Sequence, residues 1–362
     1  MKFLAIVVAL GLEQWYSSNW RGGVERLYTD YLRWLEVRMI DWGPWPATAA
    51  ALLPVFPIIG IDILAMPLWF SMLLWSVVVL YLLMGFRRFS HAVTEITKSL
   101  QNSDLSTARK ALYGWQGGDS QTLSSDDIAQ RTIEAGALEV YRCVFGVVFW
   151  FLIFGPTGAA FYWMLSLVTR EWSENPVGED ITPLTVTRSE LGKVARWLLF
   201  ILDWLPIRFL AFSFAIVGDF EDAIYQWRAR PKDNAAFDNA ANENLLLATA
   251  FGALGLTWAR RTPVSVSTES ESKLVEVVSA EVVAKEIVVG IGIEPMIASE
   301  EVVTEAAAET IKDEEVLEDT LGAPPESVPV TPGALPSAIG LVWRALLFWL
   351  GVVLLVTVAY WA

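Results

Sequence analysis

Three long stretches of this sequence carry no charged side chain, and they limit the folds open to it. Residues 64–86, 144–169 and 345–362 are uncharged over 23, 26 and 18 positions. At about 1.5 Å per residue, an α-helix of such length crosses a hydrocarbon core of roughly 30 Å. Hydrophobic residues make up 54% of the chain, more than in an average soluble protein. The sequence therefore predicts an all-α, polytopic helical membrane protein whose first partner is the lipid bilayer.

The formal net charge of −15 comes from one segment rather than from the membrane body. Residues 262–336 hold 16 acidic and 3 basic side chains, a net of −13 that leaves −2 for the remainder. This segment has no aromatic residue and is dominated by Val, Glu, Ala, Ser, Thr and Pro. Such a composition predicts a disordered acidic linker, which we bound at 259–337. A membrane domain at 1–258 would precede it, and a C-terminal transmembrane helix at 338–362 would follow.

The polar segments indicate how the chain is oriented. Residues 87–140 carry six Lys or Arg side chains, so the positive-inside rule places this loop in the cytoplasm. Within it, Asp104 or the preceding Ser103 can cap a helix, and Ser124 with Asp127 can cap the next. The sequence thus predicts a cytoplasmic loop built from two helices.

The N-terminal quarter predicts helices without fixing their relation to the membrane. Residues 1–12 are apolar, lack a signal-peptidase site and indicate a retained helix too short to span comfortably. Residues 24–38 form an amphipathic pattern that suits either the membrane surface or the protein body. Residues 47–60 contain two prolines and, with 64–86, predict a helical hairpin or a re-entrant piece.

Later apolar segments differ in how well they fit a single span. Gly155-Pro156 interrupts 144–169, which predicts either a kinked span or two half-helices. We expect a polar loop at 169–196, a span at 197–217, and a packed or surface helix at 245–258, which is too short to span.

The stretch ILDWLPIRF at 201–209 places Asp203, Pro206 and Arg208 inside an apolar run. Pro206 cannot donate to the carbonyl four residues earlier, so we expect a kink. Asp203 and Arg208 lie five residues apart, about 140° around an ideal helix, and would not face each other without it. Three interpretations stay open: an interhelical contact that fixes packing, an Arg208 that lines a cavity and holds an anion such as phosphate, or a partly wet motif near the interface.

Other charged groups give weaker signals. Arg142 suits either snorkelling at the cytoplasmic interface or ligand binding. The acids at 219–222 indicate a solvated cluster, with a Mg²⁺ site as the minority interpretation. One Cys (Cys143) and one His (His91) exclude an internal disulfide and argue against a Cys/His zinc site. We identify no catalytic residue, metal site or cofactor, and expect no nucleic-acid partner.

Two sets of residues summarise these expectations. The candidate ligand-binding side chains, for an anionic small molecule, are Arg208, Arg142, Arg109, Asp203 and Asn242. The residues that shape the helices are Trp204, Pro206, Gly155 and Pro156.

The motif around Arg208 resembles a known family. DWLPIRFLAFSFAIVGDFEDAIYQW is similar to the AmpE family of inner-membrane proteins from the β-lactamase induction locus, within the CobD/CbiB superfamily of adenosylcobinamide-phosphate synthases. Trp204, Pro206 and Arg208 match the synthase motif NWIPARLTALL, and Asp203 matches the AmpE form. DLSTARKAL around Arg109, GPTGAAFYW around Gly155, Asn242 and GALG at 252–255 resemble further family stretches.

The resemblance implies a multi-pass protein of the bacterial inner membrane. Where the synthases have Glu-Asn and Asp-Gly, this chain has Leu138-Glu139 and Arg142-Cys143. These departures favour an AmpE-like regulatory or sensory protein linked to cell-wall recycling, without catalysis. One alternative is an ATP-dependent synthase of cobalamin biosynthesis, which would need Mg²⁺. Another is a membrane scaffold whose acidic linker recruits a protein partner.

Overall fold

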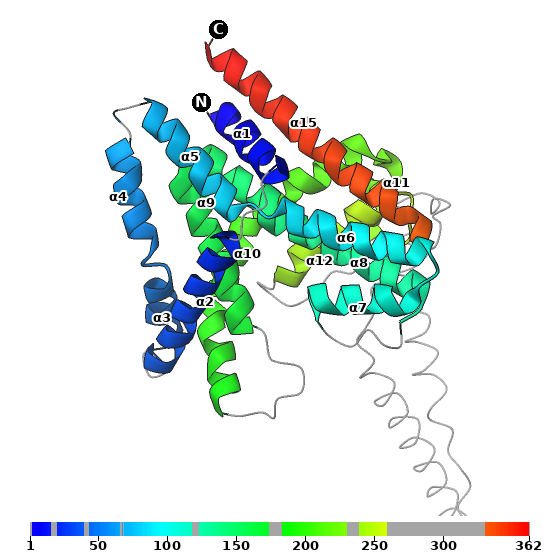
Figure 1. Cartoon of the computed structure of the whole chain (residues 1–362), viewed down its shortest axis with the longest axis horizontal. Coiled ribbons are helices and arrows are strands. Elements are labelled where there is room, and N and C mark those ends of the chain that lie inside the picture. The colour runs from blue at the N-terminus through cyan, green and yellow to red at the C-terminus, as the bar shows by residue number, and fades with distance from the viewer. Residues whose placement is uncertain are drawn as a thin grey trace, which may run out of the picture. The chain divides into compact units, whose positions relative to one another are not determined.

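The computed structural model describes residues 2–15, 20–39, 43–117 apart from 66 and 68, 123–173, 183–229, 239–258 and 330–361. The described chain is helical, without a β-strand, and its helices pack into one compact unit (Figure 1). This confirms the all-α class. Most of the predicted acidic linker lies outside the described residues, so its disorder and its protein partner stay predictions.

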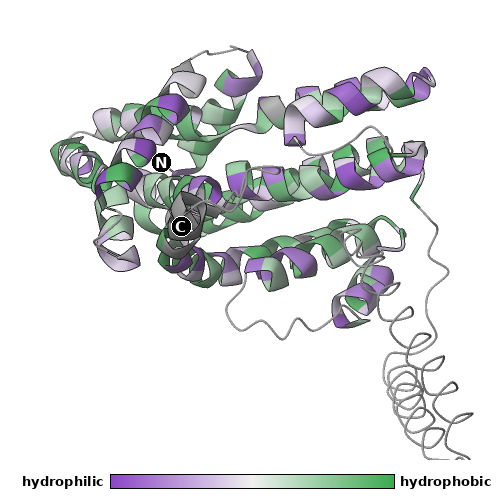
Figure 2. Ribbon diagram, turned by 90° about the horizontal axis from the view of Figure 1, so that it is seen from below, coloured by the Kyte–Doolittle hydropathy of each residue, from purple (hydrophilic) through white to green (hydrophobic). Residues whose placement is uncertain are grey.

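Four helical stretches are long and apolar enough to cross a membrane: Pro44–Ala65, Ser125–Trp172, Leu191–Val217 and Pro332–Ala359. Hydrophobic residues run along these helices in Figure 2. Many large apolar side chains face outward, such as Leu355 at 69% exposure, as expected for a surface in contact with lipid. The chain is therefore a polytopic membrane protein.

The N-terminal helices are shorter than the apolar pattern predicted. They are α1 (Lys2–Trp15), α2 (Trp20–Met39), α3 (Pro44–Ala51), α4 (Val55–Ala65) and α5 (Trp69–Leu83). The single span expected at 64–86 is wrong, because Pro67 separates α4 from α5. Proline lacks the N–H that would continue the helix and restricts the residue before it.

Helix α2 packs on the protein body rather than standing apart from it. Its Tyr28 and Tyr31 hydroxyls donate to the carbonyls of Ala51 and Ala50, at 2.9 and 2.8 Å. Burial raises the pKa of Tyr28, and the neighbouring Tyr31 raises it further. Leu27, which the periodic pattern assigned to the apolar face, is 74% exposed. The contact with α3 thus answers the question that the amphipathic pattern left open.

The loop at 87–140 contains three helices, not two: α6 (Phe86–Gln101), α7 (Leu105–Gln116) and α8 (Ser125–Val140). Asp104 caps α7 by accepting from the Thr107 amide at 3.1 Å, and Ser124 with Asp127 forms a capping box on α8. Both predicted starts are confirmed. The missed helix α6 carries a buried stripe at helical spacing, listed as Phe89, Val93, Ile96 and Leu100.

Helix α8 continues through a π-helical turn, η1 (Tyr141–Phe145), into α9 (Gly146–Ser173). At Gly155 the backbone takes φ 71° and ψ −155°, which divides α9 into two halves. A Cβ placed on Gly146 would lie 2.4 Å from the Tyr162 ring. Residues sixteen apart in one straight helix are separated by about 24 Å. The two halves therefore fold back on each other, which confirms the half-helix interpretation.

The remaining helices are α10 (Pro183–Val217), α11 (Phe220–Ala229), α12 (Asn239–Ala253), the short η2 (Pro332–Ala334) and α15 (Leu335–Trp361). Helix α10 lies at the centre and contacts α3, α9, α12 and α15 (Figure 1).

Three predictions in this region can be scored. The polar loop expected at 169–196 is wrong over most of its length, because α9 extends to Ser173 and Pro183 begins α10, a position that suits proline. Helix α12 is buried nearly throughout, which confirms a packed helix. The C-terminal helix begins at Leu335, a few residues before the predicted boundary of 338.

Candidate functional site

A buried carboxylate stands at the junction of α10 with the folded halves around η1 and α9. Asp203 is 1% exposed, and its Oδ1 accepts hydrogen bonds from Tyr141 at 2.5 Å and Tyr162 at 3.0 Å. Its Oδ2 has no hydrogen-bond partner among the described residues. Buried carboxylates are costly unless they are paired, so these two phenols account for much of the tolerance of Asp203 here.

The two tyrosines reach Asp203 because of local features in the chain. Tyr141 opens the π-helical turn, and π-turns shift the side chains that follow relative to the α-helix before them. Tyr162 comes from the second half of α9, and its ring occupies the space that a side chain at Gly146 would take. The site therefore depends on both η1 and the turn at Gly155.

Arg142 forms an ion pair with Glu243 of α12. The side chains are 37% and 24% exposed, so the pair is partly screened by its surroundings. Glu243 also accepts from Asn239 at 3.2 Å. Of the two interpretations of Arg142, snorkelling to the interface is not what the structure shows, because a carboxylate on a neighbouring helix holds its guanidinium.

Arg208 lies flat on a neighbouring ring. Its Cζ is 4.1 Å from the Trp204 ring centroid, a cation–π geometry, and its Nη1 donates to the Trp204 carbonyl at 2.6 Å. Nη1 also contacts Asn242 Oδ1 at 3.4 Å, and the Asn242 amide donates to the Phe200 carbonyl at 3.1 Å. Arg208 and Asp203 do not pair, as their spacing predicted, and α10 runs through Pro206 as one helix.

Four of the five predicted ligand-binding residues thus gather where η1, α10 and α12 meet: Arg142, Asp203, Arg208 and Asn242. Arg109 does not join them. Its Nε and Nη2 donate to the Leu123 carbonyl at 3.0 and 2.6 Å, which ties α7 to the residue before the α8 cap. The position of Arg109 therefore suits a structural contact within the helical loop.

Sequence reasoning missed Tyr141, Tyr162, Asn239 and Glu243. The tyrosines were unremarkable because aromatic residues are frequent in this chain. A usable signal stood at NAANENLLL, where four polar residues head a helix that is otherwise apolar and too short to span. A polar head on a buried helix needs partners, and here they are Arg142, Arg208 and the α10 backbone.

The described residues do not offer a Mg²⁺ site. No group of three His, Cys, Asp or Glu side chains within this part of the chain is arranged to hold a metal ion. Asp219 instead begins α11, where its Oδ1 accepts from the amides of Glu221 and Asp222 at 3.1 and 3.2 Å. Burial raises the pKa of Asp222, as do the neighbouring Asp219 and Glu221 carboxylates.

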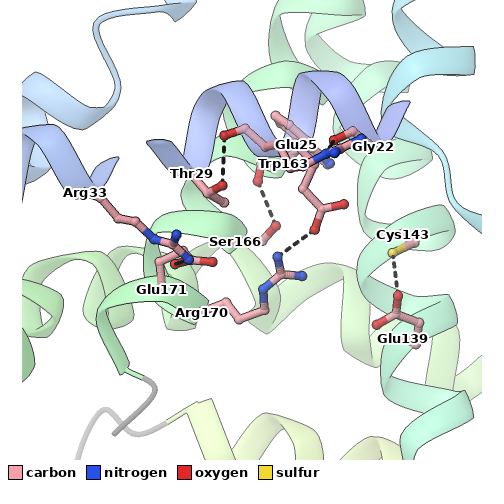
Figure 3. A network of polar contacts seen from close by, with 11 residues as sticks. Gly22, Glu25, Thr29, Arg33, Glu139, Cys143, Trp163, Ser166, Arg170 and Glu171 are labelled. Carbon is pink, nitrogen blue, oxygen red and sulfur yellow. Dashed lines mark hydrogen bonds and ion pairs between the residues drawn. The ribbon is translucent and has the colours of Figure 1, made fainter. Parts of the chain in front are cut away.

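A second polar network joins α2 to the second half of α9 (Figure 3). Arg170 pairs with Glu25 at 2.6 Å, and Arg33 lies 3.9 Å from Glu171. In the same view, the Cys143 thiol donates to Glu139 at 3.4 Å within η1 and α8. The figure shows these contacts on the α2 side of the bundle, so this network supports the arrangement of α9 from the side of α2.

The chemistry available is recognition of an anion beside a buried acceptor. Two guanidinium groups, Arg142 and Arg208, project from neighbouring elements, and guanidinium suits phosphate and carboxylate groups. Asp203 with its two phenols forms a connected set of oxygens that can accept or pass a proton.

Comparisons with known proteins agree on one family. The sequence profile described as CobD/Cbib protein matches residues 20–263. A "Cobalamin biosynthesis protein CobD" from Stutzerimonas stutzeri is 24% identical over 181 residues, covering 50% of this chain and 55% of that protein. A protein of the same description from Chromobacterium violaceum is 26% identical over 182 residues, covering 50% and 54%. The chain thus spans about half the length of these relatives. No solved structure matches it.

These findings correct the expected function. The AmpE-like, non-catalytic regulator of β-lactamase induction is contradicted, because the profile and both relatives carry the CobD description. The prediction gave too much weight to single departures such as Arg142-Cys143. Those residues are accommodated locally, Arg142 by Glu243 and Cys143 by Glu139.

Proposed function

This chain belongs to the CobD/Cbib protein family, and on that premise we propose that it acts as a membrane enzyme in cobalamin biosynthesis. The step implied by the resemblance is the ATP-dependent formation of an amide bond that yields adenosylcobinamide phosphate. The observation that carries the proposal is the position of the family match. Residues 20–263 contain the whole polar cluster, from Tyr141 to Glu243.

Each part of the cluster suits a role in holding a phosphate-bearing substrate. Arg208 presents a guanidinium whose plane is fixed by Trp204 and Asn242, so little rotational freedom remains to be lost on binding. Arg142 adds a second positive group, balanced by Glu243. Asp203 is a buried acceptor for a proton. The donor set does not fit Mg²⁺, so no step here runs through a metal ion.

The proposal includes a location. We place the protein in the bacterial inner membrane with residues 87–140 in the cytoplasm, because that segment carries the basic residues and ATP is cytoplasmic. A Ser103→Cys variant in a Cys143→Ser background tests this with an impermeant maleimide. Labelling is expected in inverted vesicles only, and labelling of intact spheroplasts would overturn the orientation.

Complementation tests the activity. A strain that lacks its own adenosylcobinamide-phosphate synthase is given this chain and grown where cobalamin limits growth. We expect growth with the wild type, loss of growth with Arg208→Gln, and growth with Arg228→Lys, an exposed arginine on α11 outside the cluster. Absence of growth while the wild-type protein accumulates in the membrane would refute the proposal.

Full growth of Arg208→Gln would refute a different part. It would leave the family activity standing and remove Arg208 from the binding of the substrate. Arg208→Lys refines the test, since lysine keeps the charge but not the planar fork.

A further inference from the structure

The turn that folds α9 back on itself leaves backbone groups without helical partners. Pro156 has no N–H, so the Leu152 carbonyl loses its donor, and Thr157 begins a new half-helix whose amide lacks an acceptor. Both groups are satisfied from elsewhere. The Lys2 ammonium donates to the Leu152 carbonyl at 2.7 Å, and Asp62 Oδ2 accepts from the Thr157 amide at 3.1 Å.

The two side chains also match the charges of the helix ends. A helix ends with a partial negative charge and begins with a partial positive one. Lys2 from α1 meets the end of the first half, and Asp62 from α4 meets the start of the second. Asp62 accepts further hydrogen bonds from the Thr157 hydroxyl and from Trp75 Nε1, the latter at 2.6 Å. The turn is thus held by opposite charges from two other helices.

The two halves of α9 and its π-helical entry carry the partners of Asp203. Tyr141 and Arg142 precede the turn, and Tyr162 follows Thr157 by five residues. Both phenols meet on Asp203 Oδ1, so any change in the angle of the turn alters at least one of those hydrogen bonds. Gly146 and Tyr162 are already in close contact, which leaves little room for compensation.

We propose that Lys2 and Asp62 are positioning residues for the buried site: by fixing the turn at Gly155, they set the places of Tyr141 and Tyr162 on Asp203. Lys2 lies outside the family match at 20–263, so this contribution of α1 does not come with the family assignment. The structural coupling stands independently of the proposed function. Only its effect on turnover rests on that function.

Infrared spectroscopy of the full chain in lipid nanodiscs tests the coupling directly. The carboxylate band of Asp203 is identified as the band lost in Asp203→Asn, and Tyr162→Phe gives the shift that follows loss of one phenol. We expect Lys2→Met and Asp62→Asn to shift the band in the same direction as Tyr162→Phe. Adding Lys2→Met to Tyr162→Phe should produce little further shift.

Matched controls separate positioning from loss of packing. Val8→Ala on α1 and Ile63→Ala on α4 change exposed side chains of the same helices and should leave the band in place. Lys2→Arg, which keeps a cationic donor, should restore the wild-type band; if Lys2→Met does not accumulate, Lys2→Gln takes its place. An unmoved band in the Lys2 and Asp62 variants would overturn the proposal, even if thermal stability fell.

Activity is measured separately. If the wild type fails to complement, the proposed function fails while the infrared result still decides the coupling. If the wild type complements, Lys2→Met and Asp62→Asn should each lower growth at limiting substrate at least several-fold, and Lys2→Arg should recover it. Normal growth of both charge variants would show that the turn does not act on the site.

Discussion

Replacing Tyr141 by Phe tests how far Asp203 depends on its phenol partners. Tyr141 and Asp203 are each 1% exposed, and the substitution removes a single oxygen while the ring stays packed. Asp203 would then keep Tyr162 as its remaining hydroxyl partner among the described residues. Because water does not reach this position, no solvent molecule replaces the lost donor as it would at a surface.

The magnitude follows from the geometry. A hydrogen bond to a charged group contributes about 1.5–3 kcal/mol, whereas hydrogen bonds between membrane helices average about 0.6 and reach about 1.7 kcal/mol. The complete burial, the 2.5 Å contact and the unpaired Oδ2 place this bond near the top of the membrane range. We expect a loss of about 2 kcal/mol in the free energy of unfolding, or roughly 4–8 °C in Tm at about 2–4 °C per kcal/mol.

The assay is thermal unfolding of the purified full chain in detergent, with Tyr113→Phe as the control. Tyr113 is 59% exposed on α7, so its hydroxyl should contribute nothing measurable. Asp203→Asn removes the charge, and the Tyr141→Phe effect should shrink to about 1 kcal/mol or less in that background. Two results would refute the reasoning: a Tyr141→Phe variant within about 0.5 kcal/mol of wild type, or a loss that Asp203→Asn leaves unchanged.

Three further predictions concern the turn, the close contact and a helix cap. Gly155→Ala should cost about 1–3 kcal/mol in thermal unfolding, because φ 71° with ψ −155° is accessible almost only to glycine; Gly351→Ala in α15, where a Cβ meets nothing within 4 Å, should instead be neutral or stabilising. Gly146→Ala should cost about 1–3 kcal/mol by the same measurement, since its Cβ would lie 2.4 Å from the Tyr162 ring, and an unchanged Tm would contradict the folded-back geometry of α9. The Thr107 hydroxyl and amide lower the pKa of Asp104 to about 2, so its contribution to the α7 start is full above the usual carboxyl value of about 3.9 and is lost as pH falls through about 2. Hydrogen exchange of the α7 amides should therefore be faster in Asp104→Asn than in wild type at pH 5 and equal at pH 2, and a difference that persists at pH 2 would argue against the ionised cap.

The sequence was sufficient for features that depend on neighbouring residues. Long uncharged runs predicted an all-α membrane protein, because the bilayer core forces backbone groups into internal hydrogen bonds. Asp104 and Ser124 marked true helix starts, since a cap satisfies amides within its own first turn. The spacing of Asp203 and Arg208 correctly predicted that they do not pair.

Other local patterns misled because a longer-range choice overrode them. The uncharged run at 64–86 is two helices, and the expected loop at 169–196 is mostly helix. Hydropathy reports where a side chain is tolerated, not where a helix ends, so proline positions and tertiary packing set those boundaries.

The candidate site shows the same division most clearly. Sequence identified Arg208, Arg142, Asp203 and Asn242 as polar groups in apolar surroundings, which is information carried by each residue with its neighbours. It could not show that Tyr141 and Tyr162 meet on Asp203, or that Lys2 and Asp62 hold the turn between them. Those contacts join residues from 41 to 150 positions apart. Such pairings exist only once α9 has folded back and α1, α4 and α10 have packed around it, so only the tertiary structure decides them.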